Sequence, residues 1–172
     1  MPETRATRVD WIVGRVTVSP LDEVLRYRND EVVHRFSADH SISKADSEEI
    51  FLETKRWLWL CANEMAAASD GIGERIPLLS EARVLDMMWH TFIIFTTEYA
   101  SFCQKYFGFF VHHHPRTRVE KEAWSKRIAE DEAGAVAERR AMLRKAYVIV
   151  ADRLGPATLK KWCEDFPARF PA

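Results

Sequence analysis

The sequence predicts an all-α, single-domain helical bundle with a short N-terminal extended arm and an extended, histidine-rich segment. Apolar residues recur at the three- and four-residue spacing of a helix face through most of the chain. Capping residues, glycines and prolines punctuate these stretches where helices should begin and end. At 172 residues the chain is long enough to bury one core of its own. We therefore expect one domain over residues 1–172, with residues 1–8 and 167–172 loose.

Composition narrows the classes of function. The chain is 47% hydrophobic and 30% charged, which is typical of a folded globular protein. A formal net charge of −1 gives no electrostatic case for a nucleic-acid or membrane-surface partner. The chain has three widely spaced cysteines, Cys61, Cys103 and Cys163, and no CxxC pair, so neither a zinc ribbon nor a disulfide framework is indicated. Without a secretory signal or an apolar run near the ~20 residues of a membrane span, we expect a cytoplasmic protein.

The first half of the chain predicts two short helices and one long one. Residues 9–18 are apolar and β-branched, which is typical of a short strand or an extended arm. Pro20 stands where a short helix can begin, and a second should cover residues 30–36. Residues 46–49 have the form of a capping arrangement that starts a long helix. Two glycines within residues 69–73 should end that helix.

A second long helix should start near Ser80 and then break. Its apolar residues lie on nearly all sides, which predicts a buried helix. We expect the break near residues 95–96, with Thr96 as the cap of a further helix. Gly108 then occupies the position of a left-handed residue that ends a helix.

The remainder should be an extended segment followed by helices. Residues 109–115 are predicted to be extended because Pro115 disfavours helix at the residue before it. Residues 118–154 should be helical with a break near Gly134, and a last turn should cover residues 159–164. The basic residues in this part are interpreted as a solvated face of mixed charge: Arg139, Arg140, Arg144 and Lys145.

A polar stripe runs along the second long helix. Arg83, Asp86 and His90 are three and four residues apart, so they share one face of a helix that is otherwise apolar. Burying such groups costs several kcal/mol unless they find partners. Asp86 and His90 could share one cation, or the carboxylate could orient the imidazole ring.

Three consecutive histidines follow in the extended segment. Side chains alternate along extended chain, so His112 and His114 should point one way and His113 the other. Imidazoles two residues apart can converge on a metal ion with ligands from elsewhere. The predicted ligands are His90, His112, His114, Asp86 and Cys103. A thiolate favours zinc or copper, and a set of histidines and carboxylate also suits iron.

Two functions from different classes remain open. A divalent-metal site with a free coordination position would make the protein a small metalloenzyme. Alternatively, Asp86 and His90 form a buried hydrogen-bond network in a non-catalytic module that binds a protein or peptide partner. Exposed aromatic rings would anchor that partner, and the candidates are Trp11, Trp124 and Trp162.

Residues 45–115 resemble the glycine-rich domain-containing protein-like family. The resemblance rests on Asp86, Trp89, His90, Tyr99, Cys103 and Gly108. Plant members of that family have a second histidine two places after the first, where this chain has Phe92. This departure argues against a mechanism that needs two histidines on this helix, and in this chain His112 or His114 could supply the missing ligand. The resemblance implies no particular reaction.

Overall fold

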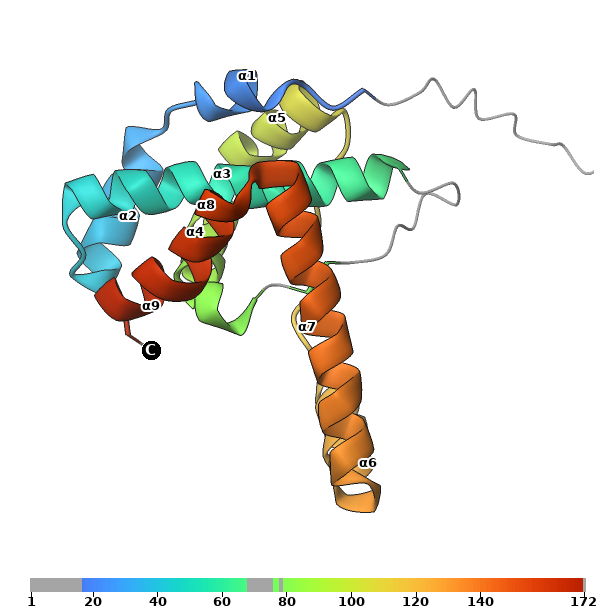
Figure 1. The fold of residues 1–172 in the computed structure, drawn as a ribbon. Helices are drawn as coiled ribbons and strands as arrows, with labels where there is room; N and C mark the ends of the chain where they lie inside the picture. Colours follow the sequence, from blue (N-terminus) through green and yellow to red (C-terminus); the bar gives the residue numbers. More distant parts are fainter. Residues whose placement is uncertain (1–16, 68–75, 78, 172) are drawn as a thin grey trace, which may run out of the picture.

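The computed structural model describes residues 17–67, 76–77 and 79–171, and every regular element in them is helical (Figure 1). The α-helices are α1 Leu21–Leu25, α2 Asp30–His40, α3 Lys44–Ala67, α4 Arg83–Ile94, α5 Thr96–Phe107, α6 Arg118–Glu130, α7 Glu132–Leu154, α8 Pro156–Lys160 and α9 Phe166–Arg169. A 3₁₀ turn at Ser80–Ala82 precedes α4, and a π-helical turn at Lys161–Asp165 joins α8 to α9. The all-α prediction is confirmed. The predicted arm lies almost wholly outside the described residues.

Helix α3 is the centre of the packing. Helices α1, α2, α4 and α7 all contact it (Figure 1). Its buried residues lie around most of its circumference. Aromatic rings fill the space between α3, α4 and α5: Tyr27, Phe51, Phe92 and Phe102 lie with ring centroids between 5.0 and 6.2 Å apart. No helix among these residues has the length and apolar character that crossing a membrane requires.

The cap of α3 lies earlier than the sequence predicts. Ser43, rather than Asp46, caps the helix: its hydroxyl accepts from the Asp46 backbone N–H at 3.1 Å and donates to the Asp46 carboxylate at 2.8 Å. Both residue types cap helices well, so the pattern alone did not choose between them. The helix ends at Ala67, and the glycines predicted to end it lie outside the described residues.

The N-terminal part of the described chain is held against α3 by two long side chains. Trp59 donates its indole N–H to the Ser19 carbonyl at 2.9 Å. The ammonium group of Lys55 donates to the carbonyls of Leu25 and Tyr27 at 3.0 and 2.7 Å, which satisfies carbonyls left over at the end of α1. Burial lowers the pKa of Lys55 to about 7.

The break between α4 and α5 is confirmed. Phe95 is not helical (φ −79°, ψ 67°), and Gly108 ends α5 in the left-handed region (φ 76°). Thr96 does not cap α5, because no side chain caps the N-terminus of this helix. The turn between α4 and α5 is instead closed by a hydrogen bond from the Phe95 N–H to the Phe92 carbonyl at 3.1 Å.

Helices α6 and α7 form a hairpin that stands away from the body (Figure 1). A capping box of Thr117 and Glu120 starts α6. The helix is interrupted at Asp131, three residues before the predicted break at Gly134. The Asp131 carboxylate accepts a hydrogen bond from the Gly134 N–H at 2.9 Å and so caps α7. None of the residues of α6 is buried.

The C-terminal helices fold back onto α3. Trp162 is fully buried and donates its indole N–H to the Glu53 carboxylate at 2.9 Å. Lys161 lies 2.8 Å from the Glu49 carboxylate, and Arg169 lies 2.6 Å from Asp46 and 2.8 Å from Glu49. The helix therefore continues to Arg169, into the stretch predicted to be loose.

Because of these ion pairs, the free energy of unfolding should decrease as the pH falls. Hydrogen bonds from Arg169 and then Lys161 lower the pKa of Glu49 below its ordinary 4.5. As the pH falls, the unfolded chain binds the proton first. The stabilisation is thus complete above about pH 4.5 and is lost as the pH falls through the folded-state pKa. We expect the urea midpoint to fall less between about pH 6 and about pH 3 in Glu49→Gln than in the wild type.

The control is Glu31→Gln, which changes an exposed carboxylate without a partner in the described part of the chain. It should keep the acid sensitivity of the wild type. Full wild-type sensitivity in Glu49→Gln would contradict the assignment.

Candidate metal centre

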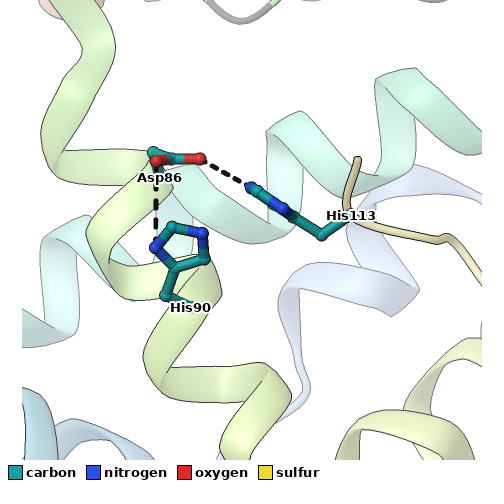
Figure 2. A group of neighbouring side chains, drawn as sticks. All are labelled: Asp86, His90 and His113. Atoms are coloured by element: carbon teal, nitrogen blue, oxygen red, sulfur yellow. Dashed lines mark hydrogen bonds and ion pairs between the residues drawn. The ribbon is translucent and has the colours of Figure 1, made fainter. Parts of the chain in front are cut away.

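Three side chains from two elements meet beside α4 (Figure 2). Asp86 and His90 lie one turn apart on that helix, and His113 comes from the extended segment. Nε2 of His113 lies 2.9 Å from Oδ1 of Asp86, and Nδ1 of His90 lies 3.8 Å from Oδ2. The two imidazole centroids are 4.4 Å apart. The carboxylate thus directs one oxygen to each ring (Figure 2).

The histidine that joins Asp86 and His90 is not one of the two expected. His112 and His114 are both exposed, with ring centroids 6.0 Å apart, while the His113 side chain is only 16% exposed. The side chains alternate along the segment as predicted, but the phase of the alternation, meaning which side chains face α4, was predicted wrongly: His113 faces α4, and His112 and His114 do not. Val111 is buried and faces the body, so the residue two places on, His113, faces it too. The apolar character of Val111 was the signal in the sequence that could have set the phase.

Two buried hydrogen bonds hold the segment in this phase. The Tyr99 hydroxyl donates to the Val111 carbonyl at 2.6 Å and accepts from the Trp89 indole N–H at 2.9 Å. The Trp89 ring also meets the His113 ring edge to face, with centroids 4.6 Å apart. Trp89 therefore contacts His113 directly and restrains its segment through Tyr99.

Cys103 lies apart from this group. It is fully buried in the core, near the backbone of Val111 and the side chain of Tyr99. Burial raises the pKa of the Cys103 thiol, which favours the protonated form over the thiolate that binds metals. Within the described residues, Cys103 packs behind the segment and Asp86, His90 and His113 form the group.

The polar stripe of α4 faces solvent instead of the core. Arg83 and His90 are exposed, with the His90 side chain 53% exposed, and Asp86 is 32% exposed. Helix α4 buries its other side and leaves Ile94 66% exposed, so the prediction of a helix buried all round was wrong. Because the three polar side chains reach solvent, the free-energy cost of burying them, which the sequence suggested, does not arise.

The geometry fits a metal ion bound by three protein ligands. All three ligand atoms lie within 4.8 Å of one another. Ligand bonds of about 2.0–2.2 Å place neighbouring ligand atoms roughly 3 Å apart, so the Asp86–His113 pair needs little movement and the His90 ring must approach. Without a metal the same contacts form a hydrogen-bond network between Asp86 and His113. Asp86 and His113 thus serve in both interpretations, while His90, 3.8 Å from Asp86, binds only in the metal site.

Comparison with known proteins identifies the family. A family model described as UCP032817-like matches residues 29–130, which include Asp86, His90 and His113. The match covers more than half of the chain, which belongs to this uncharacterised family. The resemblance to the glycine-rich domain-containing family was therefore wrong: a short motif around Trp89 and His90 did not distinguish the two. No curated protein and no solved structure matches the chain.

The hydroxyl of Tyr99 should contribute strongly to stability. Tyr99→Phe leaves the Trp89 N–H and the Val111 carbonyl without their buried partner, so we expect a loss of about 1–3 kcal/mol in the free energy of unfolding. Urea denaturation measures it.

Tyr147→Phe is the matched control, because its half-buried hydroxyl makes a 3.0 Å hydrogen bond to Glu81. A loss in Tyr99→Phe no larger than in the control would show that the two hydrogen bonds do not fix the segment.

Proposed function

We propose that this protein binds one divalent transition-metal ion through Asp86, His90 and His113. The observation that carries the proposal is the convergence of one carboxylate and two imidazoles, with ligand atoms within 4.8 Å of one another. They come from a helix and from a segment that is distant in sequence, so the fold itself brings them together. The ligand set replaces His112 and His114 by His113 and omits Cys103.

The donor atoms favour zinc or iron. Two imidazoles and a carboxylate form the ligand set of many catalytic zinc sites and of non-haem iron sites. The sequence also admitted copper, on the ground of a soft thiolate ligand. Because Cys103 is buried away from the group, the case for copper is weaker.

Three protein ligands leave coordination positions for water or a substrate. Asp86 and His90 are partly exposed, so those positions would face solvent. A bound zinc ion lowers the pKa of its water enough to supply hydroxide near neutral pH. In that event Asp86 and the two histidines hold the ion, and the protein is a small metalloenzyme of hydrolytic type.

The alternative anchors for a protein partner receive less support. Trp162 is fully buried, which makes its predicted role as an exposed anchor wrong. Trp124 is half-buried, and Trp11 lies outside the described residues. An interaction built on these three rings is therefore not the function we propose.

Metal content tests the proposal directly. Untagged protein, freed of metal and reloaded with zinc or iron(II), should hold close to one equivalent by elemental analysis. His90→Ala and His113→Ala should each weaken the affinity by more than the about 10–100-fold that loss of an outer partner costs. Titration with cobalt(II) reports the same site through its visible spectrum.

The double variant His112→Ala/His114→Ala is the matched control, since it removes two imidazoles from the same segment. It should bind metal as the wild type does. If the wild type binds no metal, or if this control loses the metal while His113→Ala keeps it, the proposal fails.

A further inference from the structure

Four exposed side chains form a row along α7. Val136, Arg140, Arg144 and Val148 are each four residues apart, and such a row is the ridge that one helix presents to another. Val136 is 41% exposed and Val148 is 53% exposed. We call these four residues the α7 ridge. It carries apolar groups at its ends and two guanidinium groups in its middle.

The ridge lies on the α6–α7 hairpin, where few residues are buried. In the described residues, most of the large apolar side chains that are exposed lie on the α6–α7 hairpin: Val119, Ile128, Val136, Met142 and Val148. Only the C-terminal part of α7 packs on α3 and α8, so much of the apolar surface of the hairpin stays in water. A third helix is the common way to cover such a surface. The tip of the hairpin extends away from α3 (Figure 1), and all four side chains of the ridge are exposed.

The charges of the ridge are not neutralised within the described chain. Neither Arg140 nor Arg144 has a hydrogen bond or an ion pair there. Two acidic side chains near the tip are paired with Arg127 of α6, which lies 3.2 Å from Asp131 and 4.0 Å from Glu138. The mixed-charge face expected from the sequence is thus split, with paired charges towards the tip and unpaired cations on the ridge.

This pattern disfavours a second copy of the chain as the occupant. Two antiparallel ridges would match Val136 with Val148, but they would set Arg140 against Arg144 and so oppose like charges in a contact that excludes water. A nucleic acid would satisfy the arginines and leave both valines against phosphate.

We propose that the α7 ridge binds an acidic amphipathic helix of another protein. That helix carries two carboxylates four residues apart, with an apolar residue one turn before and one turn after them. Each carboxylate accepts hydrogen bonds from one guanidinium group, and the apolar residues cover Val136 and Val148. The proposal is independent of the metal site, because it uses no residue of that site.

A charge-swap experiment tests this with full-length protein. The probe is a synthetic helical peptide of about 20 residues with leucine, glutamate, glutamate and leucine at four-residue spacing, and its counterpart has lysine for glutamate. We expect the wild type to bind the glutamate peptide at least about tenfold more tightly than the lysine peptide. Arg140→Glu/Arg144→Glu should reverse that preference, and Val136→Ser/Val148→Ser should weaken both complexes.

The charge-matched control is Lys121→Glu/Lys160→Glu, which reverses two exposed cations away from the ridge and should keep the preference of the wild type. Circular dichroism confirms that each variant is folded. The proposal is overturned if the peptides bind equally, if the serine variant binds as the wild type does, or if duplex DNA competes at equal charge. Sedimentation that shows a dimer broken by Arg140→Glu/Arg144→Glu would assign the ridge to a second copy instead.

Discussion

The hydroxyl group of Tyr99, held between the Trp89 indole and the Val111 carbonyl, is the constraint on which the candidate site depends. It joins α5 to α4 on one side and to the extended segment on the other. All three residues are buried, so a segment displaced by one residue would leave polar groups in the core without partners. With Val111 fixed inwards, alternation turns His113 towards Asp86.

The sequence predicted much of this arrangement and failed at one definite point. The break after α4, the left-handed Gly108 and the shared helix face of Asp86 and His90 all follow from local rules. Which of the three consecutive histidines faces α4 was missed, because the histidines themselves are identical and the one local signal is the apolar Val111 before them. The phase is set by a hydrogen bond to Tyr99, twelve residues earlier in the chain.

Burial was harder to predict than secondary structure. Helix α4 has apolar residues on nearly all sides and still exposes Ile94, since apolar residues are common on protein surfaces and only buried polar groups are costly. Trp162 shows the reverse: an aromatic residue near the chain end was expected to be exposed, but it is fully buried against Trp57, and the Glu53 carboxylate accepts its N–H. That carboxylate lies on α3, and no local pattern links the two.

The connection between the body and the hairpin gives the extended segment a second structural role. His113 is followed closely by Thr117, whose capping box with Glu120 fixes the first turn of α6. The start of α6 therefore follows directly from the short segment that positions His113, while α7 packs on α3 and α8 at the other end of the hairpin. Because α6 buries none of its residues, it cannot supply that anchoring itself. The two hydrogen bonds of Tyr99 thus restrain both the candidate metal ligand and the start of the hairpin that carries the α7 ridge.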